Sequence, residues 1–476
     1  MFRLFINGEW RETKNSKPNI NPSDVSDIIG EYAQAEVAHV EEAVGAARAA
    51  FKQWSQSTPQ QRFDVLDFIG AELLERKNEL GRLLAREEGK ILTDGIGEVI
   101  RAAYIFKFFA GEALRLSGEH LKSVRPGIDV DVLRQPLGVV ALISPWNFPI
   151  AIPAWKIAPA LAFGNTVVFK PAELTPGSAW ALAEIISRAG LPAGAFNLST
   201  GKGSMIGNVL VNHPLVDGVS FTGSVEVGRA IAVQCAQRMK KFQLEMGGKN
   251  PLVILDDADL KVAVQCAVNG AYFQTGQRCT ASSRLIVTEK IHDRFIVEVI
   301  DRLKNLKVDD ALADGTEMGP VIDESQLTKD AEYLTIAKKE GGRIAFGGER
   351  LKRLKEGFYF SPALITETTN AMRINTEEVF GPVASVIRVK DYDEALAAAN
   401  DTPFGLSAGI CTTSLKHASH FRDKAQAGMV MVNLPTAGVD YHVPFGGSKG
   451  SSYGPREQGS YAKEFYTTVK TVYTMP

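Results

Sequence analysis

Cys279 is the residue of this chain with the clearest potential for covalent chemistry. It lies in the small-residue segment TGQRCTASS (275–283), directly after Arg278. A thiolate attacks carbonyl groups well, and a neighbouring cation lowers the pKa of a thiol. Arg278 could therefore activate Cys279, or it could bind an anionic part of a substrate. The alternative is that Cys279 is a small buried residue without a chemical role.

Glu245 is the best candidate for a base that works with this cysteine. It lies in QLEMGGKN (243–250), at the end of an apolar segment and next to two glycines. Burial raises the pKa of a carboxyl group, so Glu245 can act as a general base near neutral pH. The alternative is a carboxylate held by the glycine backbone. His213 and His442 are the only histidines near these segments, and neither belongs to a local Cys–His hydrolase signature.

Composition excludes several other classes of function. The four cysteines show no CxxC spacing and have no histidine at ligand spacing, so we expect neither a metal site nor a disulfide framework. The net charge is −2 and the basic residues form no stripe, which argues against nucleic acid as a partner. We find no signal peptide and no apolar run of about 20 residues, so we expect a cytoplasmic protein without a membrane partner.

The elements that must position these residues follow from hydrophobic periodicity. Segments 37–54, 61–90 (as two helices) and 98–116 are amphipathic, so the N-terminal quarter is predicted to be largely helical. From Asp129 onward strands and helices alternate, which predicts βαβ units and a parallel sheet. Ligands bind beyond the carboxyl ends of such strands. These ends are 144–147, 170–173, 200–203 and 222–224, and they form a candidate cofactor crevice.

A second alternation of strands and helices begins near Asn250 and predicts a second α/β domain. The chain closes with YTTVKTVYT (466–474), whose β-branched and aromatic residues predict a late, exposed strand that could pair with another subunit. The chain has 476 residues, which is too long for one ordinary hydrophobic core, so we expect two or three domains.

Glycine-rich segments give a weaker signal for a nucleotide. GKGSMIG (201–207) has one spacer too many for GxGxxG, and GSVEVG (223–228) lacks the ending of a P-loop, so nucleotide hydrolysis is rejected. A Gly-Ser turn that opens a helix still presents free backbone N–H groups, which suit a pyrophosphate. In FKPAE, Glu173 could accept the hydroxyls of an adenosine ribose. The alternative is that Lys170 and Glu173 form a solvated pair in a loop.

Seven motifs together resemble the NAD(P)-dependent aldehyde dehydrogenase superfamily. They are, in order and spacing, SPWNFP, FKPAE, FTGS, LEMGGKNP, GQRC, EEVFGPV and PFGGSKGSSYG, and the resemblance spans essentially the whole chain. It implies an α/β fold with three parts. These are a doubly wound NAD(P)-binding domain (1–116 and 137–245), an α/β catalytic domain (246–435) and a small β-arm for oligomerisation (117–136 and 450–476). It also implies a homodimer or homotetramer.

The resemblance implies a role for each central residue. Cys279 is the nucleophile that adds to the aldehyde and forms a thiohemiacetal. Asn147 and the backbone N–H of Cys279 are the oxyanion donors. Hydride transfer to the nicotinamide then leaves a thioester, and Glu245 activates the water that hydrolyses it. Lys156 has a lesser role in proton relay.

The cofactor implied is NAD, with NADP possible. Glu378 and Phe380 match residues that hold the nicotinamide ribose. Glu173 favours NAD, because a 2′-phosphate would meet its charge at close range. The cofactor residues expected from the motifs and strand ends are Ser144, Trp146, Lys170, Glu173, Gly203, Gly223, Ser224, Glu378 and Phe380.

The segment 433–459 resembles the corresponding part of bacterial 2-ketoglutaric semialdehyde (2,5-dioxopentanoate) dehydrogenases, which form 2-oxoglutarate in the breakdown of pentoses and sugar acids. This substrate carries a distal carboxylate, so its pocket needs a fixed cation or several donors. Arg278 and Arg101 are the candidates, although Arg101 could instead lie on a solvated helix face. Three residues match apolar positions of the substrate tunnel: Phe148, Trp155 and Phe445.

Several alternatives stay open. Succinic and glutaric semialdehydes carry the same distal anion, and a broad aliphatic aldehyde dehydrogenase has no need of the arginines. Phosphorylating and CoA-acylating relatives commonly lack the counterpart of Glu245, so its presence favours hydrolysis to the acid. A non-catalytic structural or binding relative would have no need to keep Cys279, Glu245 and Asn147 together.

Overall fold

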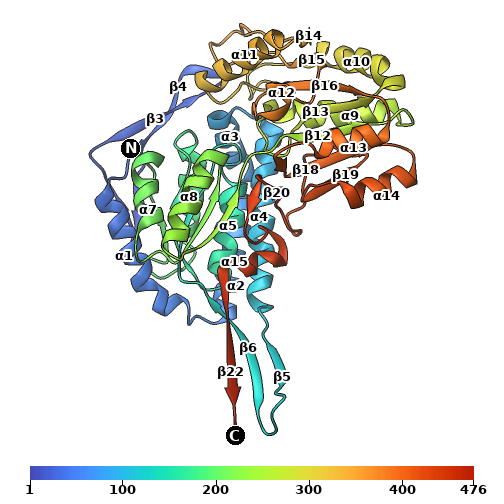
Figure 1. The fold of residues 1–476 in the computed structure, drawn as a ribbon. Coiled ribbons are helices and arrows are strands. Elements are labelled where there is room, and N and C mark those ends of the chain that lie inside the picture. The colour runs from blue at the N-terminus through green and yellow to red at the C-terminus, as the bar shows by residue number, and fades with distance from the viewer.

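Two large β-sheets and a projecting arm organise the chain in the computed structural model, which describes residues 1–476 (Figure 1). The first sheet has eight strands in the order β2-β1-β9-β8-β7-β10-β11-β21, and its five central strands run parallel. Buried runs such as VVALI and TVVFK are typical of strands covered on both faces. The strands are β1 (Leu4–Ile6), β2 (Glu9–Arg11), β7 (Val139–Ile143), β8 (Thr166–Lys170), β9 (Phe196–Leu198), β10 (Gly218–Thr222), β11 (Lys241–Glu245) and β21 (Ser452–Tyr453).

Helices cover both faces of this sheet, so it is doubly wound. One face packs against α1 (Val37–Trp54), α7 (Asn208–Asn212) and α8 (Val225–Gln237). The other packs against α2 (Pro59–Glu75), α3 (Lys77–Glu88), α4 (Leu92–Leu114), α5 (Ala151–Ala162), α6 (Pro176–Ser187) and α15 (Lys463–Tyr466). A short π-helix, η1 (Gly203–Gly207), precedes α7. The predicted helices in 37–54, 61–90 and 98–116 are confirmed, and Gly164 ends α5 with φ +83° as expected of a helix stop.

The N-terminal segment contains strands that the sequence prediction missed. β1 and β2 join the edge of the first sheet, and β3 (Ser16–Asn21) and β4 (Asp24–Ala33) form a hairpin. β1 pairs with β9 through the single register Phe5↔Leu198, far away in the sequence. The hairpin reaches the second half of the chain, where the Tyr359 hydroxyl donates to the Ser23 carbonyl at 2.7 Å.

The second sheet has seven strands in the order β14-β15-β16-β13-β12-β18-β19, parallel except at β14. This confirms the predicted second α/β alternation. Its strands are β12 (Asn250–Ile254), β13 (Ser282–Thr288), β14 (Arg343–Phe346), β15 (Ala363–Thr368), β16 (Val383–Val389), β18 (Ser407–Cys411) and β19 (Met429–Val432). Its helices are α9 (Leu260–Ala271), α10 (Glu289–Lys304), α11 (Glu324–Lys339), α12 (Arg373–Thr376), α13 (Tyr392–Asn400) and α14 (Leu415–Lys424), with the short 3₁₀ turn η2 (Phe273–Gly276).

The projecting arm is a three-stranded antiparallel sheet, with the C-terminus at its tip (Figure 1). It consists of β5 (Glu119–Lys122), β6 (Asp129–Pro136) and β22 (Thr467–Thr474), and β22 is the predicted terminal strand. Residues 450–466 lie in the body: β21 pairs with β11, and η3 (Gly459–Ala462) leads into the buried α15. β17 (Phe404–Gly405) and β20 (Ser448–Lys449) form a small separate pair. None of the helices combines the length and the apolar character that a membrane crossing requires.

The two large sheets face each other through opposite edges. Glu245 ends β11 at the carboxyl edge of the first sheet, whereas Cys279 lies just before β13, at the amino edge of the second. Contacts cross this boundary: the Asn147 side chain donates to the Gln277 carbonyl at 2.9 Å. The segments that carry chemistry in the sequence therefore meet at one junction.

Candidate active site

Cys279 lies in a loop whose backbone is held under strain. Gln274 and Thr275 have φ of 52° and 56°, a region that a β-branched residue rarely adopts. Downstream, the Asn250 side chain donates to the Cys279 carbonyl at 2.8 Å and to the Ala281 carbonyl at 3.0 Å. The loop therefore has one defined path into β13, and this path fixes where the thiol points.

The electrostatics of Cys279 differ from the simplest prediction. Burial, together with the nearby carboxylates of Glu378 and Glu245, raises the pKa of the thiol to about 12. The residue's own backbone N–H and Arg278 lower the pKa, but these effects are outweighed. Arg278 thus lowers the pKa of the thiol, as its position in the sequence suggests, but desolvation is the larger effect and favours the neutral thiol in the resting protein.

Arg278 itself is tied to the protein backbone. Its Nη2 donates to the Asn269 carbonyl at 2.6 Å and to the Gly270 carbonyl at 2.9 Å, near the end of α9. Burial lowers the pKa of this guanidinium to about 10, while Asp94 and Cys279 raise it. These contacts anchor the loop that carries Cys279, and they occupy one end of the guanidinium fork.

Asn147 and Cys279 line the same cavity of about 220 Å³. Asn147 is 3% exposed, and its bond to the Gln277 carbonyl leaves its second amide N–H free to turn toward a ligand. Five of the predicted cofactor residues line this cavity as well. The lining residues are Pro145, Trp146, Asn147, Ile152, Thr222, Gly223, Ser224, Met246, Gly247, Cys279, Gln326, Lys329, Glu378 and Phe380.

Glu245 is buried near Cys279 and has the properties of a base. Its Oε2 accepts a hydrogen bond from the Ser452 hydroxyl at 2.6 Å. Burial and the charge of Glu457 raise its pKa well above the usual value, and this outweighs the lowering by Ser452 and Lys156. Lys156 is fully buried on α5, where its ammonium bonds Glu457 and donates to the Ser220 hydroxyl at 2.8 Å. A chain of ionisable groups thus leads from Glu245 into the interior.

The cavity has features that fit a nicotinamide dinucleotide. The hydroxyl of Thr222, at the cavity wall, is buried and has no partner in the protein, and the same holds for Ser144, which follows the neighbouring strand β7. Ser224 caps α8, whose N-terminal N–H groups open beside Gly223 at the cavity wall. Glu378 accepts the Gly248 N–H at 2.8 Å, and Phe380 packs edge-on against Trp146.

Glu173, Lys170 and Gly203 form a second cluster at the same sheet edge. The Gly203 N–H donates to Glu173 Oε1 at 2.8 Å, so Gly203 orients the carboxylate. The second oxygen of Glu173 lies 3.8 Å from the Lys17 ammonium. Lys170 donates to the Pro171 carbonyl, and burial lowers its pKa to about 8. Lys170 and Glu173 are therefore not a solvated pair in a loop. Each has a defined partner, and the Glu173 oxygen that faces Lys17 accepts no hydrogen bond from the protein.

Arg101 does not lie on a solvated helix face, which was the alternative for this residue. Its Nη2 donates to Gln458 Oε1 at 3.1 Å, and its guanidinium lies 5.7 Å from the ring centroid of Trp155. Its Nε is buried and has no partner. Burial lowers its pKa, while Glu98, Cys279 and Asp440 raise it, so the cation lies within electrostatic reach of the thiol.

Of the apolar residues predicted for a tunnel, Trp155 lies beside Arg101 and contacts Phe445. Trp155 stacks on Phe445 with centroids 5.2 Å apart, and Cys279 packs against the cluster that contains Phe445. Phe148 instead lies beneath the Lys90 ammonium, 3.9 Å from its ring centroid. Tyr104 and Tyr441, which the sequence did not single out, stack 5.5 Å apart near this wall.

Other residues at the site were not singled out from the sequence, although Ser452 lies in the motif PFGGSKGSSYG and Glu457 and Gln458 lie in the segment 433–459. They gain their positions from contacts that are distant in the sequence. They are Lys90, Glu98, Ser220, Ser452, Glu457 and Gln458. For Lys90 the local signal was the charged run EEGK at 87–90, in a segment that is otherwise amphipathic.

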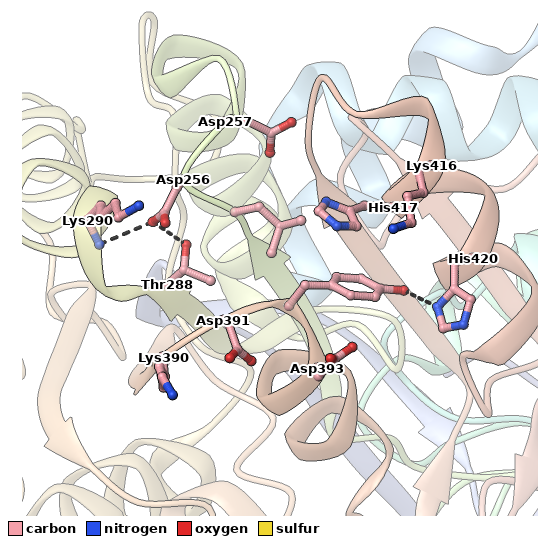
Figure 2. Close-up of a pocket in the computed structure, with 12 residues that line it drawn as sticks. Asp256, Asp257, Thr288, Lys290, Lys390, Asp391, Asp393, Lys416, His417 and His420 are labelled. Atoms are coloured by element: carbon pink, nitrogen blue, oxygen red, sulfur yellow. Dashed lines mark hydrogen bonds between the residues drawn. The ribbon is translucent and has the colours of Figure 1, made fainter.

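A second polar hollow lies at the carboxyl ends of β12, β13 and β16, away from Cys279 (Figure 2). Asp256 accepts from the Thr288 hydroxyl at 2.6 Å, Asp391 caps α13, and the Tyr392 hydroxyl bonds His420 at 2.7 Å. Asp391 therefore caps the start of a helix, and Asp256 bonds the last residue of a strand, so both carboxylates have structural partners. The lysines at its rim are exposed, and it contains no cysteine or serine nucleophile.

Comparisons with known proteins agree with this geometry. A profile of the aldehyde dehydrogenase family matches residues 10–472. The chain is 43% identical to an alpha-ketoglutaric semialdehyde dehydrogenase of Bacillus subtilis, over 99% of this chain and 98% of the relative. It is 41% identical to a 2,5-dioxopentanoate dehydrogenase of Saccharolobus solfataricus, over 96% and 95%. A crystal structure of betaine aldehyde dehydrogenase from Staphylococcus aureus in complex with NAD+ superposes with a TM-score of 0.97 at 38% identity, covering 100% of this chain and 95% of the other. The chain therefore belongs to the aldehyde dehydrogenase family of oxidoreductases.

Proposed function

We propose that this protein oxidises an aldehyde that carries a distal carboxylate, 2-ketoglutaric semialdehyde above all, to the corresponding acid with NAD(P)+. One observation carries the proposal: Cys279 and Asn147 share a cavity with the candidate cofactor residues, and the unpartnered Nε of Arg101 lies within electrostatic reach of the thiol. The product would be 2-oxoglutarate, which places the reaction in pentose or sugar-acid catabolism.

In this mechanism the Cys279 thiol loses its proton to water, and its sulfur adds to the aldehyde carbon. The free amide N–H of Asn147 and the backbone N–H of Cys279 bind the oxygen that becomes negative, and they are in place before the reaction begins. A bound nicotinamide would serve as the hydride acceptor. Cys279 then holds the acyl group as a thioester. Glu245 takes a proton from water, which attacks the thioester and releases the acid and the thiol.

The proton on Glu245 has a route away from the site. Ser452 bonds Glu245, and Lys156 lies in the same buried group together with Glu457. Glu457 Oε2 is buried without a partner, so it can accept either a proton or a hydrogen bond from water. Lys156 keeps its lesser, relaying role in this proposal.

The cofactor would be held along the carboxyl edge of the first sheet. Glu173 would accept the adenosine ribose, Ser224 and the start of α8 would face the pyrophosphate, and Glu378 with Phe380 would hold the nicotinamide ribose. Glu173 favours NAD because it repels a 2′-phosphate. Lys17, 3.8 Å away, offsets part of that repulsion, so NADP remains usable.

In this proposal Arg101 determines which substrates the site prefers. A fixed guanidinium would offer the distal carboxylate of the substrate charge-assisted hydrogen bonds, which are strong and directional. Gln458 orients Arg101 from one side and Trp155 from another. The relatives from Bacillus subtilis and Saccharolobus solfataricus are named for this same substrate, which supports the proposal. A cationic substrate such as betaine aldehyde would be repelled by this arginine.

Succinic and glutaric semialdehydes are the second candidates, because each presents the same distal anion to Arg101. A panel assay separates these possibilities. NADH formation is measured with 2-ketoglutaric, succinic and glutaric semialdehydes, betaine aldehyde and a plain aliphatic aldehyde. We expect kcat/KM for 2-ketoglutaric semialdehyde to exceed the others by roughly tenfold or more, about 1.4 kcal/mol of discrimination. A flat profile, or a preference for uncharged aldehydes, would discard the arginine pocket and leave the family assignment unchanged.

A further inference from the structure

A buried ion pair lies directly behind the loop that carries Asn147, and no motif or mechanistic step accounts for it. Lys90 follows α3, and Glu98 lies on α4. Their side chains are 1% and 2% exposed, and the Lys90 ammonium donates to Glu98 Oε2 at 2.7 Å. Burying two charges is costly unless every bond is satisfied, so the contacts of this pair indicate what it does.

Those contacts converge on one segment, 147–151. The Lys90 ammonium donates to the backbone carbonyl of Asn147 at 2.8 Å and lies 3.9 Å from the ring centroid of Phe148. The other oxygen of Glu98 accepts the N–H groups of Ile150 at 2.9 Å and Ala151 at 3.1 Å. These are N–H groups at the start of α5 that have no partner within the helix. One ion pair therefore holds both ends of the turn.

Lys90 keeps its charge in this environment. Burial lowers the pKa of Lys90, but Glu88 and Glu98 more than compensate and raise it. Asp94 is the remaining acidic group that faces the ammonium and acts in the same direction. Burial raises the pKa of Glu88 to about 8. Lys90 therefore offers the Asn147 carbonyl a charge-assisted hydrogen bond, which is shorter and more directional than a neutral one.

We propose that Lys90, oriented by Glu98, is a positioning residue for the acylation step: it fixes the backbone of Asn147 so that the side-chain amide faces the carbonyl being attacked by Cys279. The proposal rests on the role of Asn147 under Proposed function. Oxyanion donors work only when they are placed beforehand, and a displacement of about 1 Å can cost roughly a hundredfold in rate. Asn147 has one side-chain anchor, the Gln277 carbonyl, so its backbone needs another.

The competing explanation is that the pair stabilises the fold and has no specific link to Asn147. A double-mutant cycle distinguishes the two. Lys90→Met, Asn147→Ala and the double variant are mixed rapidly with saturating NAD+ and the aldehyde that the wild type oxidises best. The rate constant of the first NADH turnover is then measured for each. Lys107→Met is the matched control, because Lys107 is a lysine on α4 that pairs with Asp67 at 2.7 Å on the partly exposed side.

We expect Lys90→Met to slow the first turnover by about ten- to a hundredfold in the wild-type background, but by no more than about threefold when Asn147 is already alanine. NAD+ affinity, followed by quenching of tryptophan fluorescence, stays within about twofold. Equal slowing in both backgrounds would overturn the proposal, since the effect would not pass through Asn147. If Asn147→Ala alone leaves the first turnover unchanged, the oxyanion assignment itself fails.

A second variant covers the case in which Lys90→Met does not fold. Glu98→Gln keeps the shape and one acceptor oxygen for Ile150 and Ala151, but it removes the charge that orients Lys90. We expect slowing in the same direction, again lost in the Asn147→Ala background. An additive effect of Glu98→Gln in the two backgrounds would contradict the proposal as clearly as the first cycle. Lys107→Met is expected to change the first turnover by less than about twofold.

Discussion

At the scale of single residues, burial sets the properties of the proposed catalytic pair. It raises the pKa of Cys279, so the neutral thiol is favoured in the resting protein, and it raises the pKa of Glu245 above the usual value of a carboxyl group. The sequence identified both residues, because motifs mark them. It could not give the sign of the thiol shift, since that depends on how completely the surrounding chain excludes water. The adjacent Arg278 was the visible signal, and it is the weaker effect.

Alkylation of Cys279 should therefore depend steeply on pH. Below a pKa of about 12 the thiolate fraction rises about tenfold per pH unit. We expect the rate of inactivation of the free protein by iodoacetamide to rise about tenfold per unit between roughly pH 7 and pH 9. A plateau in this range would mean that the thiol is already ionised. Intact-protein mass spectra with Cys279→Ala as control would confirm that the label is on this residue, since the other cysteines are buried.

Replacing Glu245 should separate the two halves of the reaction. We expect Glu245→Gln to lower steady-state kcat by about 10²–10⁴, because water is no longer activated. The first turnover of NADH, one per site, should remain, since hydride transfer precedes hydrolysis. Rapid mixing followed by absorbance of NADH measures both phases. If the first turnover is lost along with kcat, Glu245 acts before the thioester forms, and the proposed assignment is incorrect.

At the scale of elements, local patterns were sufficient for most of the fold. Helix α1 spans the predicted 37–54, and the strand ends that carry Ser144, Lys170 and Thr222 meet at one edge as the βαβ rule requires. The β3–β4 hairpin was missed although its pairing is local. β1 and β2 were missed because each is only three residues long and β1 joins the sheet through β9, which is remote in sequence. The Lys90–Glu98 pair was missed for the same reason: its partners at 147–151 are remote in sequence.

Gly247 gives a prediction at this scale, because the turn after β11 must leave room for Glu378. A Cβ at Gly247 would overlap the Glu378 carboxylate, and its φ does not demand glycine. We expect Gly247→Ala to weaken NAD+ binding by about tenfold, or 1.4 kcal/mol, by displacing Glu378. Fluorescence titration measures the Kd. Gly45→Ala on α1, where a Cβ meets nothing within 4 Å, is the control and should leave the Kd unchanged.

At the scale of the whole molecule, the role of the arm in the assembly of subunits remains a prediction. β22 forms one edge of its sheet, with Val469 59% exposed and Tyr473 60% exposed. Such an edge pairs readily with another chain. The sequence predicted the strand from its composition, but the exposed apolar face became visible only in the structure, because it depends on which side β6 covers.

A charge in this edge should break the assembly without unfolding the protein. We expect Val469→Asp to reduce the mass in light scattering from that of a dimer or tetramer to that of the 51.7 kDa monomer, with the unfolding of the body largely unchanged. Leu354→Asp, at a fully exposed apolar position of the second half, is the control. An unchanged mass for Val469→Asp would assign the subunit contact to another surface.

The central claim is that Arg101 recognises a distal carboxylate while Cys279 attacks the aldehyde. Its most direct test is kcat/KM of the wild type and of Arg101→Met with two substrates, 2-ketoglutaric semialdehyde and pentanal. A hydrogen bond to a charged group contributes about 1.5–3 kcal/mol, so the variant should lose roughly ten- to a hundredfold or more on the keto acid and less than about threefold on pentanal. Equal losses on both substrates would contradict the account, because Arg101 would then support the site without reading the substrate.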